Sequence, residues 1–148
     1  MDMRWTIHLP RERASVPMVR RLLMGAMETA GVDPGVAAEI GLALSEACAN
    51  VVEHAHGTHP DTQFEVRARI IGSRCRIEVS DTGPGFPPER LGTPLHHVAA
   101  PGAESGRGLL LIEAMSDRVQ LRNHPQKGAV IRFEKSLRWR KDSLLPTA

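Results

Sequence analysis

Aromatic side chains are scarce in this chain of 148 residues, which has no tyrosine, three phenylalanines and two tryptophans. Proteins that bind single-stranded nucleic acid stack the bases on aromatic side chains and attract the backbone with a basic groove. The 19 basic and 17 acidic residues leave a formal net charge of only +2. Direct binding to nucleic acid is therefore not expected.

Cysteines and long apolar runs are also scarce. The two cysteines, Cys48 and Cys75, are not arranged as a Cys-x-x-Cys pair and lie inside apolar patterns. This predicts buried free thiols and neither a disulfide nor a metal pair. Glu39 and Glu46 interrupt the most apolar segment, and the first fifteen residues contain no secretory signal. These absences predict a cytoplasmic protein that does not enter a membrane.

The composition is that of an ordinary soluble domain. Hydrophobic residues make up 41% and charged residues 24% of the chain, close to the average for globular proteins. A chain of this length usually forms one domain with one core. We predict a single domain over residues 1–137 and a flexible C-terminal tail over residues 138–148.

The first half of the chain predicts one strand and two helices. Polar and apolar residues alternate over residues 4–9, as in a half-buried strand. Ser15 is expected to cap a helix that ends at Gly31. Asp33 is expected to cap a second helix, which is predicted to end near Gly57.

The second half predicts two hairpins with a helix between them. The first hairpin turns at Gly72-Ser73. Residues 87–105 have no sustained period and are expected to form a functional loop or a lid. Helices among mostly antiparallel strands predict an α+β fold, a two-layer sandwich with the helices packed on one face of the sheet. The predicted strands are 64–70, 75–79, 118–123 and 129–137, and the predicted helix is 106–117.

A polar stripe runs along the otherwise apolar second helix. Glu46, Asn50 and His54 follow one another at intervals of four residues, which places them on one face of a helix. An amide oxygen is a suitable ligand for a Mg²⁺ ion that bridges phosphates. A carboxylate one turn away could orient or deprotonate a hydroxyl group. Any one of these residues alone would more often be a solvated surface residue.

Two glycine-containing segments could hold a nucleotide. Asp81 follows a predicted strand, and Gly83 and Gly85 allow the backbone to turn sharply and approach a ligand closely. A carboxylate at that place can accept a hydrogen bond from an exocyclic amine such as that of adenine. The segment Gly106-Arg107-Gly108 begins a predicted helix, where free N–H groups and the arginine favour phosphate oxygens.

Together these segments resemble a known superfamily. "SEACANVVEHA", "DTGPGF" and "GRGLLLIEAMSD" occur in the order of the N, G1 and G2 boxes of the Bergerat-fold ATPases, which include the ATP-binding domains of histidine kinases, gyrases and chaperones. Within this superfamily the chain is most similar to the anti-sigma factor serine kinases of bacteria. The resemblance spans nearly the whole chain.

The resemblance implies ATP and Mg²⁺ as cofactors and a role for each motif residue. Glu46 would be the catalytic general base acting on the substrate serine, and Asn50 would coordinate Mg²⁺. Asp81 would recognise the adenine amino group. Gly83 and Gly85 would shape the nucleotide pocket, and Gly106, Arg107 and Gly108 would surround the phosphates.

The resemblance also implies protein partners. Such proteins sequester a sigma factor or phosphorylate a serine of an anti-anti-sigma protein, so that two partners compete for one kinase. It further implies a homodimer, with the first strand and helix as the expected interface.

Alternatives remain open at this stage. The superfamily often has threonine after the glycine that begins the last strand, whereas Ala129 follows Gly128 here, which removes a hydrogen bond typically worth ~0.5 to 1.5 kcal/mol. This departure favours a nucleotide-gated binding module without kinase activity, and a small ATPase that uses water as acceptor is a third reading. A zinc site at His54, His56 and His59 is less favoured, because a loop at a helix end rarely fixes such ligands.

Overall fold

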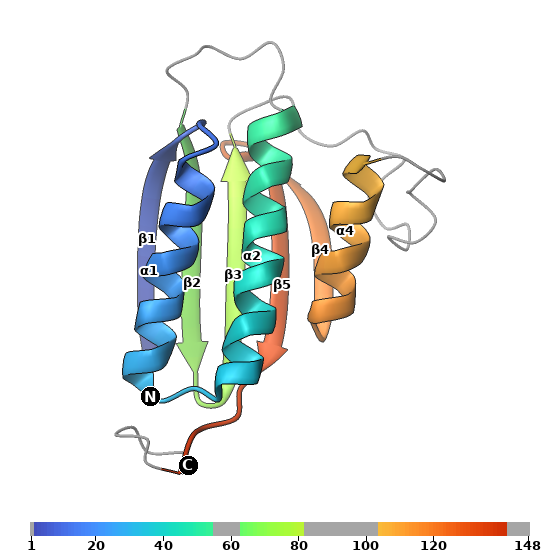
Figure 1. Ribbon diagram of the computed structural model, residues 1–148. Coiled ribbons are helices and arrows are strands. Elements are labelled where there is room, and N and C mark those ends of the chain that lie inside the picture. The colour runs from blue at the N-terminus through green and yellow to red at the C-terminus, as the bar shows by residue number, and fades with distance from the viewer. Residues whose placement is uncertain (1, 55–62, 82–103, 142–148) are drawn as a thin grey trace.

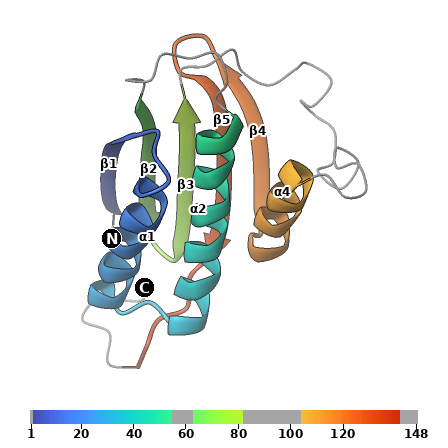
Figure 2. The ribbon, with the colours of Figure 1, turned by 45° about the horizontal axis from the view of Figure 1, so that its top comes forward.

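The computed structural model describes residues 2–54, 63–81 and 104–141, which form two layers (Figure 1). One layer is a five-stranded sheet with the strand order β1-β2-β3-β5-β4, in which every neighbouring pair is antiparallel. The helices α1, α2 and α4 form the other layer, all on one face of the sheet (Figures 1 and 2). This arrangement confirms the predicted α+β sandwich. The elements are β1 (Asp2–Pro10), α1 (Ser15–Ala30), α2 (Pro34–His54), β2 (Gln63–Ile71), β3 (Arg74–Asp81), α4 (Glu104–Met115), β4 (Arg118–His124) and β5 (Gly128–Ser136).

The strands follow the alternation of the sequence, because successive side chains point to opposite faces of a sheet. In β2, residues Phe64, Val66, Ala68 and Ile70 are buried while the residues between them are more exposed. The β2–β3 hairpin turns at Gly72, whose φ of 57° suits glycine. The predicted hairpin is thus confirmed.

The start of α1 differs from the prediction. Ala14 occupies the N-cap position and makes no side-chain capping hydrogen bond, and Ser15 is the first helical residue. The Ser15 hydroxyl instead donates a hydrogen bond of 2.7 Å to the carbonyl oxygen of Pro10. The prediction of Ser15 as N-cap is wrong because this hydroxyl ties the helix to the end of β1. The helix ends as predicted at Gly31, which has a φ of 90°.

The start of α2 agrees with the prediction. The backbone N–H of Val36 donates a hydrogen bond of 3.1 Å to Oδ2 of Asp33, which therefore caps the helix. The helix is long and apolar enough to span a membrane by length and composition alone, but half of that stretch is buried inside the protein. It packs against α1, α4 and β3. Burial in a two-layer core explains its apolar composition.

Both cysteines lie in this core. Cys48 on α2 and Cys75 on β3 are free and buried. Burial away from water raises the pKa of each thiol to about 12, because it disfavours the charged thiolate. The prediction of buried free thiols is confirmed.

The first residues of the predicted tail are bound to the helical layer. Val32 and Trp139 form an isolated antiparallel bridge. The Asp33 N–H donates to the Arg138 carbonyl oxygen at 2.7 Å, and the Arg140 N–H donates to the Gly31 carbonyl oxygen at 2.7 Å. Residues 138–140 therefore hold the chain between α1 and α2 against the end of β5.

Candidate nucleotide-binding site

Three elements carry the predicted site residues. Glu46 and Asn50 lie one turn apart on α2, and both side chains are partly buried. The segment 106–108 lies in the first turns of α4, which packs beside α2. Asp81 is the last residue of β3. Figure 2 shows that α2 and α4 stand on the same face of the sheet.

Glu46 and Gly108 meet where α2 and α4 pack together. Oε2 of Glu46 lies 3.2 Å from the position that a Cβ atom on Gly108 would occupy. Any larger residue at position 108 would press on this carboxylate. The structure therefore brings the predicted general base against the glycine of the predicted phosphate segment, two residues that are 62 positions apart in the sequence.

Asp81 is held by an arginine that the sequence analysis did not identify. Nη2 of Arg11 lies 3.3 Å from Oδ1 of Asp81, and the two side chains are only 6% and 13% exposed. Arg11 follows the end of β1, and the register places Leu9 opposite Phe64 and Phe64 opposite Asp81. Two strand pairings thus bring together residues that no local motif connects.

Ala129 lies near Asp81 on the sheet. Ser80 pairs with Val130 across β3 and β5, so Asp81 and Ala129 are the next residues along the two antiparallel strands. Their positions alternate with Ser80 and Val130, which places them on the face that carries the helices. The methyl group of Ala129 therefore stands in the region where the superfamily's threonine would offer a hydroxyl.

Several predicted residues cannot be placed in the same way. Gly83, Gly85, His56 and His59 lie outside the described residues, as does most of the predicted loop 87–105. Gly106 and Arg107 belong to α4 by their backbone. The contacts of these residues remain predictions.

The described groups suit an ATP site. Gly108 leaves space beside a carboxylate on the neighbouring helix, and α4 begins close by, where the unpaired N–H groups of a helix start favour anions. Asn50 supplies one neutral oxygen, which fits Mg²⁺ because this ion usually keeps several waters and phosphate oxygens as ligands. Asp81 supplies a largely buried carboxylate at the end of β3, on the helical face of the sheet.

Comparison with known proteins decides the family. A model of the histidine kinase-like ATPase domain matches residues 9–135. The serine-protein kinase RsbW of Bacillus subtilis (strain 168) is 30% identical over 122 residues, which cover 78% of this chain and 76% of that protein. The chain belongs to the anti-sigma factor serine kinase family of histidine kinase-like ATPase domains. The match begins at the end of β1 and extends into β5, so it includes every described residue of the candidate site.

Other relatives agree with this assignment. The serine-protein kinase RsbW of Oceanobacillus iheyensis is 29% identical over 132 residues, which cover 86% of this chain and 82% of that protein. Among solved structures, the RsbU and RsbW domains of Rv1364c from Mycobacterium tuberculosis match with a TM-score of 0.69 and 22% identity over 99% of this chain and 36% of that chain. The latter similarity supports the fold of this family member.

Proposed function

We propose that this chain is an ATP-dependent serine-protein kinase that also acts as an anti-sigma factor in partner switching. The observation that carries the proposal is the position of the Glu46 carboxylate beside Gly108 at the contact between α2 and α4. The relatives named serine-protein kinase support a protein serine as the phosphoryl acceptor.

In the proposed reaction each motif residue has one task. Asp81 accepts a hydrogen bond from the adenine amino group, and Gly83 and Gly85 give the base room. The N-terminal part of α4, with Gly106, Arg107 and Gly108, binds the phosphates. These contacts would orient the γ-phosphoryl group toward the acceptor serine, whose hydroxyl lies beside Glu46 in the proposed reaction.

Glu46 acts on the acceptor. Its carboxylate accepts the proton of the serine hydroxyl while the serine oxygen forms a bond to the γ-phosphorus and the bond from that phosphorus to the bridging oxygen of ADP breaks. Asn50 would hold a Mg²⁺ ion, which would supply positive charge to the phosphate oxygens. Phosphoserine and ADP are the products.

The proposed partners are a sigma factor and a serine-bearing anti-anti-sigma protein. Binding of one would exclude the other, and phosphorylation would release the second. We propose that the protein works in the cytoplasm as a homodimer that uses β1 and α1. Met18 and Leu22 on α1 are 54% and 50% exposed, so the helix offers apolar side chains for such an interface.

A second candidate is a nucleotide-gated binding module that does not transfer phosphate. Ala129 favours this candidate, because its methyl group cannot replace the hydroxyl that the superfamily often has near the adenine-binding aspartate. In that case Glu46 would serve only to position α4.

Transfer assays with Glu46→Gln separate the two candidates. The purified protein is incubated with radiolabelled ATP, Mg²⁺ and the anti-anti-sigma protein of the same cell. Because glutamine cannot accept the proton, transfer should fall by about 10²- to 10⁴-fold, the usual contribution of a general base. ATP affinity should stay within about twofold of the wild-type value, since Glu46 contacts neither the adenine nor the metal in the proposed reaction.

Glu28→Gln is the matched control, because this exposed glutamate lies on α1 and away from the α2–α4 contact. It should transfer phosphate at the wild-type rate. A normal rate of phosphoryl transfer by Glu46→Gln would refute the role of Glu46 as general base. Absence of transfer by the wild-type protein would favour the nucleotide-gated binding module.

A further inference from the structure

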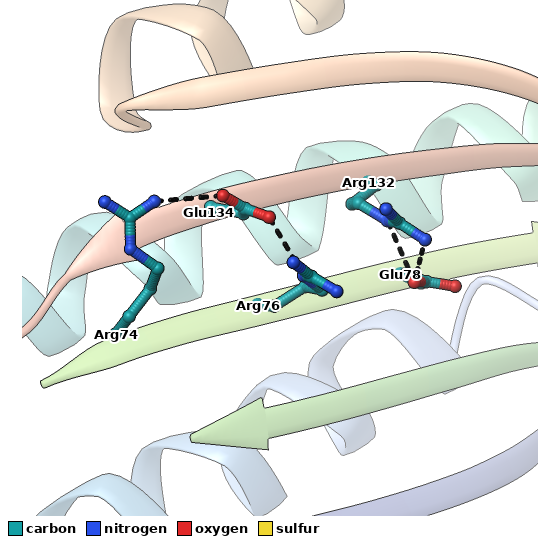
Figure 3. A network of polar contacts seen from close by, with 5 residues as sticks. All are labelled: Arg74, Arg76, Glu78, Arg132 and Glu134. Atoms are coloured by element: carbon teal, nitrogen blue, oxygen red, sulfur yellow. Dashed lines mark hydrogen bonds and ion pairs between the residues drawn. The ribbon is translucent and has the colours of Figure 1, made fainter. Parts of the chain in front are cut away.

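The face of the sheet opposite the helices carries many arginines. Within the described residues no helix covers this face, and Figure 3 shows five of its side chains, on β3 and β5, on the side of the strands away from α2. Strand alternation assigns eight arginines and four carboxylates to it, an excess of positive charge that exceeds the net charge of the whole chain. The arginines are Arg4, Arg67, Arg69, Arg74, Arg76, Arg118, Arg122 and Arg132, and the acids are Asp2, Glu65, Glu78 and Glu134.

Pairing between the strands places arginines directly beside one another. One row across all five strands consists of Arg4, Arg69, Arg76, Glu134 and Arg118. Like charges that face each other across strands destabilise a sheet. The three adjacent arginines on β1, β2 and β3 share the carboxylates of Asp2 and Glu134, and an additional anion would further reduce the repulsion among them.

The acids of this face are already engaged by arginines. Arg74 and Arg76 lie 3.0 and 2.9 Å from Glu134, and Arg132 lies 2.8 Å from Glu78 (Figure 3). Asp2 contacts Arg4 and Arg69, each at 3.2 Å. These contacts show that the face binds carboxylates through guanidinium groups, whose planar fork matches a carboxylate.

A groove lies among the arginines of β1, β2 and β3. Its volume is about 310 Å³, and it is lined by Arg4, Thr6, Arg67, Arg69, Arg76 and Glu78 together with parts of Trp5 and Ala68. Arg67 pairs with Glu65 as Arg4 does with Asp2, but the two arginine side chains are 50% and 66% exposed, so N–H groups on both remain accessible to a partner. The groove offers several guanidinium hydrogen-bond donors, and Glu78 is the only carboxylate among its lining residues.

We propose that this arginine face, centred on the groove between β1 and β3, binds an acidic segment of a partner protein. Carboxylate side chains of the partner would enter between Arg4, Arg67 and Arg69. The basic face extends beyond the groove to β5 and β4, which suits an extended polypeptide better than a single small anion. This surface lies on the other side of the sheet from the proposed kinase site and does not depend on it.

Other occupants fit the charges less well. A continuous phosphate backbone would meet the carboxylates interspersed among the arginines, and Trp5 packs against the core, so its ring offers no stacking surface to bases. A second copy of this chain would bring the same excess of arginine to the interface, and like charges across an interface oppose association.

The double variant Arg4→Gln/Arg67→Gln tests the proposal. A fluorescent peptide of about 20 residues that alternates Glu and Ala is titrated into the full-length chain, and binding is followed by fluorescence anisotropy. Loss of two accessible guanidinium groups should weaken binding by about tenfold, and salt should weaken wild-type binding as well. The control Arg13→Gln/Arg21→Gln removes two exposed arginines that lie outside the sheet, one between β1 and α1 and one on α1, and should bind like the wild type.

Each result of this experiment either supports or overturns the proposal. Circular dichroism melts first establish that both double variants fold. The proposal is overturned if the wild-type chain does not bind the peptide or if the control loses as much affinity as the test variant. It is also overturned if single-stranded DNA of about 20 nucleotides binds this face more tightly than the peptide. Loss of self-association in the test variant would identify a second copy as the occupant instead.

Discussion

At the scale of single residues, Arg11 is the least expected part of the site. A buried carboxylate is stable when an opposite charge or hydrogen-bond donors accompany it. Arg11 supplies that charge to Asp81 from the turn after β1. Because Oδ1 of Asp81 faces Arg11, the ion pair fixes the rotation of the carboxylate that we assign to adenine recognition.

Replacement of Arg11 should therefore weaken nucleotide binding. We expect Arg11→Gln to lower ATP affinity about tenfold and to destabilise the fold by about 3 kcal/mol, since it removes the opposite charge that accompanies a largely buried carboxylate. Arg11→Lys keeps the charge and should restore part of both losses. Isothermal titration and thermal melts measure the two effects, with the exposed Arg13→Gln as control. Wild-type ATP affinity in a folded Arg11→Gln protein would contradict the positioning role.

Residue patterns alone predicted part of this site. Glu46, Asn50 and Asp81 could be proposed because they stand in short motifs, and the structure brings Glu46 close to Gly108. Their roles in binding and catalysis stay predictions. Arg11 could not be found, because its contact with Asp81 depends on two strand registers and not on local sequence. Ser15 was misassigned because a hydroxyl can bond either to a helix start or to a neighbouring strand.

At the scale of secondary-structure elements, we expect the α2–α4 contact to link the stability of the fold to the proposed activity. Glycine inside a helix costs roughly 0.5 to 1 kcal/mol relative to alanine. Gly108 nevertheless lies in α4, where a Cβ atom would come within 3.2 Å of Glu46 Oε2. We infer that the space beside the carboxylate is worth more to function than the added helix stability.

Gly108→Ala should therefore change stability and transfer in opposite directions. The new methyl group must displace the Glu46 carboxylate, so we expect the rate of phosphoryl transfer to fall about tenfold while stability stays equal or rises by up to ~1 kcal/mol. Gly25→Ala on α1 is the matched control, because nothing lies within 4 Å of its added Cβ atom. That variant should gain stability and keep its activity. An unchanged transfer rate for Gly108→Ala would show that the contact is only structural.

The sheet contains a second coupling between elements. Glu134 on β5 is 6% exposed at its side chain and receives Arg74 and Arg76 from β3. Burial alone would raise the pKa of Glu134, but the hydrogen bonds and charges of Arg76 and Arg74 outweigh it and hold the pKa below its ordinary value of 4.5. A lowered carboxyl pKa stabilises the fold above the ordinary value and ceases to do so as the pH falls through the folded-state pKa.

Glu134→Gln should accordingly be destabilised in a pH-dependent way. We expect a loss of about 1 to 3 kcal/mol in the free energy of unfolding at neutral pH, from charge-assisted hydrogen bonds that become neutral. The difference from the wild type should shrink as the pH falls below 4.5. Urea unfolding at several pH values measures it, with the exposed Glu113→Gln on α4 as control. A difference that does not depend on pH would contradict the ionic origin.

At the scale of the whole molecule, the fold was predictable because periodicity and turns agree. Alternation over β2 and β3, the glycine turn between them and the Asp33 N-cap of α2 all agree with the same antiparallel architecture. The arginine face was not predicted, because the eight arginines are spread over residues 4–132 and only the strand order brings them together. The net charge of +2 for the whole chain gives no indication of this local excess of arginine.

The two faces of the sheet have different proposed roles. Nucleotide and acceptor serine would meet on the side of α2 and α4, and acidic segments would bind on the opposite side of the sheet. In the proposed exchange of partners, such a second surface would remain available while the helical face is occupied. The two-layer fold provides such a surface because its helices cover only one side.

The measurement that tests the central claim most directly is a calorimetric titration of the purified protein with ATP, in the presence and absence of Mg²⁺. The account predicts saturable binding of ATP that Mg²⁺ strengthens, because Asp81 would bind the adenine and Asn50 would bind the metal at the same site. Absence of saturable binding under both conditions would contradict it, and partner sequestration without nucleotide would then be the better explanation of this fold.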